Sequence, residues 1–269
     1  IDNYKTIDNL LSKSLIGGGF NEIMTNSICS PEANQLNNEH TPIEIINPQG
    51  IELSNLRVSL LPGMIDTIGF NINRQSKNLK LFEIGNTYQK IDKNNNETRT
   101  LSIALCGEVF EESWLVDYNT DNFFYLKGVV DKLFNDLSLE VNYNAKNDSN
   151  YSQKLLIRKG KETIGFMCEL NKKMLNKYSL DTKVYYAEID ISKIDVSKIN
   201  TKYKEVSKFP SSRRDVSMIL DSKINFDEIK RLSFSVDKNI LKEVDLFDVY
   251  KDNSIGNDKK SYAVSFMFN

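Results

Sequence analysis

Three stretches of the chain carry apolar residues at the three- and four-residue spacing of an amphipathic helix. One lies near the N-terminus, one follows Pro62, and one begins near Asp121. Proline suits the first turn of a helix, because the N–H that it lacks has no helical partner there. The pattern predicts three helices with core-facing residues Tyr4, Ile7, Leu11 and Leu15; Leu61, Met64, Ile65, Ile68 and Ile72; and Phe123, Leu126, Val130, Leu133 and Leu137.

Shorter apolar runs, bounded by glycine or polar residues, are typical of strands. Lys159 and Gly160 separate two such runs and predict a hairpin. The glycines at 17–19 follow a helix, so they indicate a helix end rather than a phosphate-binding loop. The expected strands cover residues 20–28, 79–84 (ending at Gly85), 101–106, 154–158, 163–169 and 184–191, and residues 92–99 form a polar connection.

A polar, lysine-rich passage from 192 to 208 is the best candidate for a domain boundary, which gives domains of residues 1–200 and 201–269. Beyond it, the pattern predicts strand 215–220, helix 226–236 and strands 243–250 and 261–268. This β-α-β-β order is the first part of a ferredoxin-like βαββαβ unit. Because the chain begins at Ile1 and stops directly after a β-forming run, we expect a piece of a longer polypeptide. The small sheet should then lack its closing strand, with the apolar residues of 261–268 under-packed.

Composition narrows the class of protein without naming a function. The chain has 269 residues, 40% of them hydrophobic, and a formal net charge of −2, which gives no overall attraction to DNA or to a membrane. No apolar run approaches the roughly 20 residues that cross a bilayer. The three cysteines form no close pair, which indicates reduced thiols and a cytoplasmic protein.

Most sequence motifs of catalysis are absent. The chain has no phosphate-binding G-x-x-x-x-G-K-[ST], no G-x-S-x-G and no H-E-x-x-H. Its only histidine, His40, lies in a polar stretch and is expected on a surface loop rather than as a catalytic base. The acidic residues Glu111, Glu112 and Asp117 could bind a metal, but a solvated loop is the simpler interpretation. We therefore predict no catalytic and no metal-binding residue.

The strongest local charge surrounds the start of the first strand of the second domain. Five basic and two acidic residues give a net +3 between residues 202 and 215: Lys202, Lys204, Lys208, Arg213 and Arg214 against Glu205 and Asp215. Strand alternation puts Arg214 on the apolar face and Arg213 on the opposite face with Asp215. Arg213 can contact a phosphate or pair with Asp215, and the residues alone do not decide between them. Lys208, Arg213 and Arg214 are our candidate RNA-binding residues.

Several motifs resemble one family in the order in which they occur. NPQGIELSNLRVSLLPGMIDTIGFNINR, LKLFEIGNTY, DNFFYLKGVVDKLF, KFPSSRRDVSMIL and LKEVDLFDVY are similar to the C-terminal third of the β subunit of bacterial phenylalanyl-tRNA synthetases. The resemblance runs from about Tyr4 to Asn269. It implies an α+β protein with a class II synthetase-like antiparallel sheet flanked by helices. A ferredoxin-fold anticodon-binding domain follows, incomplete after βαββ.

The resemblance also implies what the first domain lacks. Active class II synthetases place an ATP-gripping arginine after the strand that corresponds to residues 81–88, but Gln89 and Lys90 stand here. Their Gly-x-Gly-x-x-Arg helix start has no counterpart between Gly165 and Asn200. Arg57 is then structural or interfacial rather than catalytic. We expect the fold of an adenylating enzyme without its active site, which lies in the partner α subunit.

The function implied is that of a scaffold. The first domain would pack on the α subunit within a heterotetramer, with helix 62–73 and helix 123–137 as the candidate contacts, although an ordinary core position is the preferred interpretation for any single residue of either helix. The second would contact tRNA-Phe, and the whole complex would use ATP and Mg²⁺ to attach phenylalanine. The alternatives are a self-sufficient adenylating ligase and a free-standing RNA-binding protein.

Overall fold

The structure is a computed structural model that describes residues 3–36, 40–92, 94–109, 114, 122–195, 208, 210–237 and 239–269. The chain divides into two compact units, residues 1–201 and 202–269, and each is described by itself. The helices of the first unit are α1 (Asn3–Gly17), α2 (Pro31–Asn34), α3 (Leu61–Ile72), α4 (Asn122–Asp136) and α5 (Lys172–Lys177). Its strands are β1 (Asn21–Glu22), β2 (Ile28–Cys29), β3 (Asn55–Leu56), β4 (Leu79–Ile91), β5 (Asn94–Cys106), β6 (Asn142–Ala145), β7 (Tyr151–Lys159), β8 (Glu162–Leu170) and β9 (Val184–Asp190).

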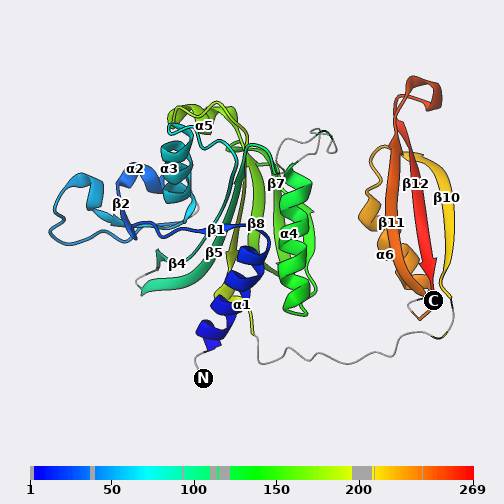
Figure 1. Cartoon of the computed structure of the whole chain (residues 1–269), viewed down its shortest axis with the longest axis horizontal. Coiled ribbons are helices and arrows are strands. Elements are labelled where there is room, and N and C mark those ends of the chain that lie inside the picture. Colours follow the sequence, from blue (N-terminus) through cyan, green and yellow to red (C-terminus); the bar gives the residue numbers. More distant parts are fainter. Residues whose placement is uncertain are drawn as a thin grey trace. The chain divides into compact units, whose positions relative to one another are not determined.

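A seven-stranded sheet with the order β1-β4-β5-β9-β8-β7-β6 forms the centre of the first unit. Helices α1 and α4 cover one face of this sheet, and α3 and α5 lie on the other (Figure 1). The predicted core residues of α4 are all buried, as are Leu61, Met64, Ile65 and Ile68 of α3. Asn171 caps α5 by accepting a hydrogen bond from the Met174 N–H at 2.8 Å. The periodic stretches therefore form the helices that the sequence predicts.

The sheet differs from the prediction in three places. It is mixed rather than purely antiparallel, because β1 pairs with β4 in parallel. The strand expected over residues 20–28 is wrong, since only the two-residue strands β1 and β2 form there. Gly85 does not end a strand either: β4 continues through it to Ile91 and pairs with β5 along its whole length, so most of the polar stretch 92–99 belongs to β5.

The second unit is a three-stranded antiparallel sheet with one helix. Strands β10 (Ser212–Asp221), β11 (Leu241–Tyr250) and β12 (Lys259–Phe268) take the order β10-β12-β11, and α6 (Phe226–Val236) packs on one face. The Asn225 N–H donates to the Glu228 carboxylate at 3.1 Å, as the capping pattern predicts. This strand order is that of the first three strands of a ferredoxin-like unit.

The expected under-packing of residues 261–268 is wrong for Tyr262 and Val264, whereas Phe266, Met267 and Phe268 are only half-buried. Strand β12 lies between β10 and β11, so Val264 is fully buried and Tyr262 is 7% exposed. The exposed apolar residues of this unit lie on the outer strands and on α6 instead; they include Val216, Ile219, Phe247, Leu232 and Val236. Within the described residues, β10 has a neighbour on one side only.

Candidate functional site

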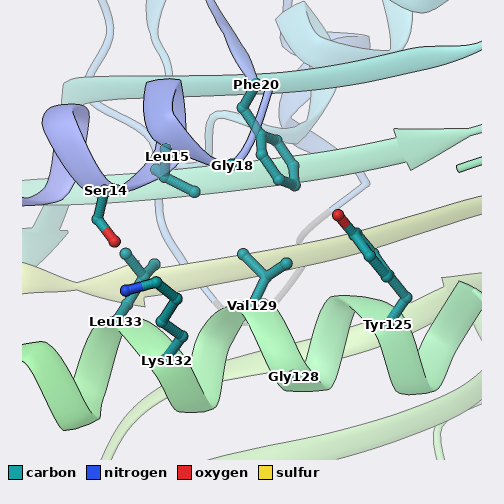
Figure 2. Close-up of a pocket in the computed structure, with 9 residues that line it drawn as sticks. All are labelled: Ser14, Leu15, Gly18, Phe20, Tyr125, Gly128, Val129, Lys132 and Leu133. Atoms are coloured by element: carbon teal, nitrogen blue, oxygen red, sulfur yellow. The ribbon is translucent and has the colours of Figure 1, made fainter. Parts of the chain in front are cut away.

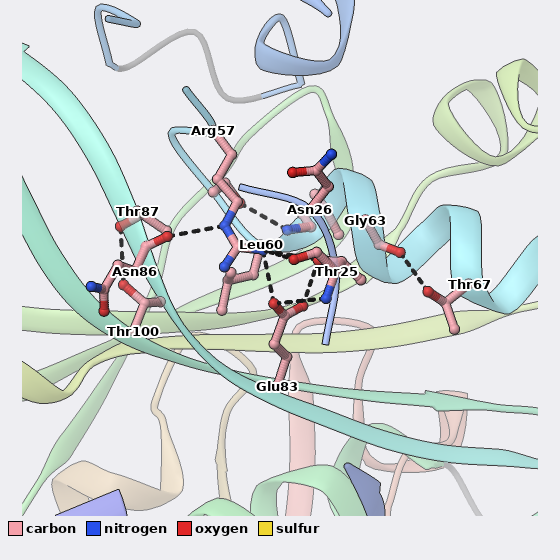
Figure 3. Close-up of polar contacts among 12 residues, drawn as sticks. Thr25, Asn26, Arg57, Leu60, Gly63, Thr67, Glu83, Asn86, Thr87 and Thr100 are labelled. Carbon is pink, nitrogen blue, oxygen red and sulfur yellow. Dashed lines mark hydrogen bonds and ion pairs between the residues drawn. The ribbon is translucent and has the colours of Figure 1, made fainter. Parts of the chain in front are cut away.

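An arginine and a glutamate pair inside the first unit, on the α3 side of the sheet (Figure 3). Arg57 follows β3 and is 5% exposed, and its Nη1 lies 2.8 Å from Oε1 of Glu83 on β4. Its Nε donates to the carbonyl of Asn86 at 3.0 Å, and Nη1 also donates to Thr25 Oγ1 at 2.9 Å. The Thr25 hydroxyl in turn donates to Glu83 Oε2 at 2.7 Å. These bonds satisfy a charge that would be costly to bury alone.

Two glycines make room for this network. A Cβ on Gly85 would lie 2.3 Å from Arg57 Nη2, and a Cβ on Gly63 would lie 2.5 Å from the Thr25 hydroxyl oxygen. Gly85 therefore leaves the space that the arginine over the strand occupies, while β4 continues through it in unbroken pairing with β5. Arg57 is held as a structural residue within the unit.

A second buried carboxylate, Glu188 on β9, lies on the same face of the sheet. Its Oε2 accepts hydrogen bonds from the Ser59 hydroxyl at 2.6 Å, from the Leu60 N–H at 3.1 Å and from the Tyr186 hydroxyl. Burial raises the pKa of Glu188, and these three donors offset only part of that effect. Strand register places Ser102 of β5 between Glu188 and Glu83, and the buried Ser102 hydroxyl has no hydrogen-bond partner among the residues that the structure describes.

A polar cavity of about 270 Å³ opens beside Glu188, over strands β4, β5, β7, β8 and β9. The cavity collects residues that the sequence analysis did not connect. Its lining includes His40, Tyr88, Gln89, Thr98, Thr100, Tyr151, Lys154, Phe166, Glu188, Asp190 and Lys193. His40 is in a half-buried loop position, as expected, but it also faces this cavity.

No arginine lines the cavity among the described residues, and Gln89 does line it. Lys154 is the most buried cation there, and its Nζ lies 2.8 Å from Asp148 Oδ2. The same ammonium lies 4.6 Å from the ring centre of Tyr151 and 4.8 Å from that of Phe166. The charge of Lys154 is thus compensated by Asp148 and by the two aromatic rings within the protein. In the part of the chain that the structure describes, no group of three potential metal ligands occurs. Glu111, Glu112 and Asp117 lie outside that part.

On the other face of the sheet, an apolar groove of about 260 Å³ runs between α1 and α4 (Figure 2). Leu15 and Phe20 line it on one side, and Val129 and Leu133 line it on the other. Gly128 of α4 opens directly onto the groove, and a Cβ there would meet no atom within 4 Å. Large apolar residues on these helices, Leu10, Ile16 and Phe124, are exposed.

The candidate RNA-binding residues begin the second unit. The Arg213 Nε lies 2.8 Å from Asp215 Oδ1, and about half of each side chain is exposed. This hydrogen bond raises the pKa of Arg213 further, and Asp245 of β11 adds to the effect. Arg214 is exposed and donates to the carbonyl of Arg213 at 2.9 Å, and Lys208 is exposed. The structure therefore forms the internal pair that the residues alone left as one of two possibilities.

No helix among the described residues is long and apolar enough to cross a membrane. Comparisons with known proteins match both units. Residues 2–191 match the family described as phenylalanyl tRNA synthetase beta chain CLM domain, and residues 207–269 match the ferredoxin-fold anticodon binding domain.

Curated relatives named phenylalanine–tRNA ligase beta subunit match nearly the whole chain. The phenylalanine–tRNA ligase beta subunit of Bacteroides fragilis is 34% identical over 99% of the chain and 35% of its own length. That of Streptococcus thermophilus is 31% identical over 94% of the chain and 32% of its own length. The chain thus spans about a third of the relatives that it matches.

Solved structures of low sequence identity share the fold of a large part of the chain. Pyrrolysyl-tRNA synthetase from Desulfitobacterium hafniense superimposes with a TM-score of 0.57 at 14% identity, and the match covers 74% of this chain and 73% of that one. At this identity the similarity concerns the fold, which is that of a synthetase.

Proposed function

The chain belongs to the phenylalanyl-tRNA synthetase β chain family, and we propose that it acts within such a β subunit as a non-catalytic scaffold. The first unit packs against the catalytic α subunit of a heterotetramer, and the second contacts tRNA-Phe. The assembled enzyme attaches phenylalanine to tRNA in the cytoplasm. ATP and Mg²⁺ belong to the site of the α subunit, and none of the residues described above is assigned to them.

The observation that carries the scaffold role is the internal pairing of the charges on the α3 side of the sheet. Binding a nucleoside triphosphate requires cations that can turn to its phosphates. Arg57 is instead held by Glu83, and Lys154 by Asp148, both at 2.8 Å. Gln89 faces the cavity from the strand after which an active enzyme of this fold would present its arginine. The cations on this sheet face stabilise the unit itself and are not free to bind ATP. This supports the proposal that another subunit carries out the catalysis.

The α1–α4 groove is the surface that best fits an α-subunit contact. Its walls are apolar, and exposed apolar residues lie on both helices that form it. Large contiguous apolar surfaces mark protein–protein contacts, and an apolar groove beside exposed apolar residues is a candidate for one. We propose that an apolar segment of the α subunit packs into this groove.

Gly128 provides the test, because it lines the groove and a Cβ added there meets no atom of the protein within 4 Å. We expect Gly128→Glu in the complete β chain to reduce the yield of complex with the α subunit at least tenfold. Gly128→Ala should leave assembly intact and slightly stabilise α4, since alanine is the better helix former. Co-purification and size-exclusion chromatography measure both. Equal assembly of the two variants would contradict the groove contact.

The scaffold role itself has a separate test. Pyrophosphate exchange with ATP and phenylalanine should require the α subunit and should be absent from the 269-residue chain alone. Exchange by the chain alone would favour the self-sufficient ligase. A complete β chain that never co-purifies with an α subunit would favour the free-standing RNA-binding protein.

A further inference from the structure

Glu188 is a buried carboxylate with one satisfied oxygen and one open oxygen. All three of its hydrogen bonds reach Oε2, and their donors are uncharged. Its Oε1 accepts no hydrogen bond from the described residues, and it is not among the fully buried unpartnered atoms. The residue is 9% exposed and lines the polar cavity. The open oxygen therefore meets the cavity.

The cations around the cavity are already committed to other acids. Lys154 pairs with Asp148 at 2.8 Å, and Lys193 pairs with Glu162 at 3.3 Å and Asp190 at 3.6 Å. Arg57 is held by Glu83. Among the charged residues that line the cavity, the charges of Lys193 and Asp190 neutralise each other. The charge of Lys154 is neutralised by Asp148, which lies outside the lining. Among the described residues Glu188 makes no ion pair; His40, which shares the lining, is the one basic group that lowers its pKa through charge, and burial outweighs that effect.

A buried carboxylate without a counter-ion takes up a proton or a cation. We propose that this cavity binds a small organic monocation, whose primary ammonium group contacts Glu188 Oε1. A primary ammonium offers three donors, and the Thr98 and Thr100 hydroxyls on β5 lie in the same lining. The rings of Tyr151 and Phe166 also belong to it; the Lys154 ammonium already lies over both, so they offer apolar surface to the body of the ligand rather than to its ammonium.

The size and charge of the cavity define the ligand class. About 270 Å³ holds an amine with a six-membered ring or a short chain. A free carboxylate on the ligand would face Asp190 and Glu188 together, so a simple amine fits better than a zwitterionic amino acid. This binding is separate from the scaffold role and needs no catalysis in the chain.

The probe is 4-fluorobenzylamine, with 4-fluorobenzyl alcohol as its uncharged counterpart. Binding to the complex of the complete β chain with its α subunit is followed by fluorine NMR. We expect the wild-type complex to bind the amine at least tenfold more tightly than the alcohol. Glu188→Gln keeps an oxygen for the three donors and removes the charge, so it should weaken the amine at least tenfold. Asp190→Asn removes the neighbouring carboxylate and should change the affinity less than threefold.

Comparing variants isolates this cavity, because any amine site on the α subunit is the same in all of them. Thr98→Lys supplies a second, independent test, since its tethered ammonium can occupy the cavity and should abolish the Glu188-dependent binding. The Thr98→Lys variant also tests the proposal if the Glu188→Gln chain does not assemble with the α subunit. The proposal would be overturned if the wild-type complex bound the amine and the alcohol equally. It would also be overturned if the wild type, Glu188→Gln and Thr98→Lys bound the amine equally; Glu188 would then be a protonated core residue. Complex assembly in the same samples reports on the scaffold role separately.

Discussion

Arg57 and Arg213 each make an ion pair at 2.8 Å, one in each unit of the chain, yet the two pairs differ in everything except distance. The side chains of Arg57 and Glu83 are 6% and 2% exposed. Those of Arg213 and Asp215 are 53% and 48% exposed. A buried pair cannot exchange its partner without leaving a charge uncompensated, whereas an exposed pair can open to water or to a ligand. The first arginine is thus fixed in structure, and the second remains available for phosphate.

The largest effect should come from removing one member of the buried pair. Arg57→Met keeps most of the side-chain volume but leaves Glu83 buried with only the Thr25 hydroxyl and N–H as donors. We expect it to lower the free energy of unfolding by about 3–5 kcal/mol. Urea denaturation followed by circular dichroism measures this change. Arg213→Met is the matched control and should leave the unfolding curve unchanged, so similar losses from both variants would break the comparison.

A smaller effect should come from disturbing the same pair without removing a charge. Gly85→Ala places a methyl group 2.3 Å from Arg57 Nη2 and about 3.2 Å from Glu83 Oε1, and should cost about 1–3 kcal/mol of unfolding free energy. If the arginine is the cause, most of this cost should disappear in an Arg57→Ala background, because the nearest atom is gone. Additive losses in a double-mutant cycle would show that the backbone of β4, and not Arg57, requires the glycine.

The buried pair also shows how far the sequence can be interpreted. Helices α3, α4 and α6 are predictable because their apolar periodicity is local and their buried faces follow from it. Glu83 carried a usable signal, since strand alternation places it on the same face as Leu81, where a charge needs a partner. That partner could not be identified, because Arg57 lies 26 residues away and comes close only through the fold.

The polar cavity was less predictable still. It joins His40, Lys154 and Glu188, which come from a loop, β7 and β9; strand pairing through β8 brings the last two to one sheet face, and the path of the loop adds His40. The opposite holds for Arg213 and Asp215, which are two residues apart on one strand face. Their pairing could be expected from alternation, but a competing phosphate contact was equally consistent with the same residues.

The subtlest test asks whether the exposed pair opens for RNA. Arg213→Glu in the complete β chain, assembled with its α subunit, should weaken tRNA-Phe binding and reduce the slope of log K against log salt by about one unit. The structure adds a competitor, since the Nε of Arg213 already donates to Asp215 and the carboxylate lies beside any phosphate that the arginine would bind. Asp215→Asn should therefore strengthen binding slightly, because it frees Arg213 and removes a repulsive charge. Filter binding across a range of salt concentrations separates these effects. If Arg213→Glu leaves both the affinity and the slope unchanged, then Arg213 has a structural role within its own sheet, as Arg57 has. Lys208 and Arg214 would then be the remaining candidates for the RNA contact.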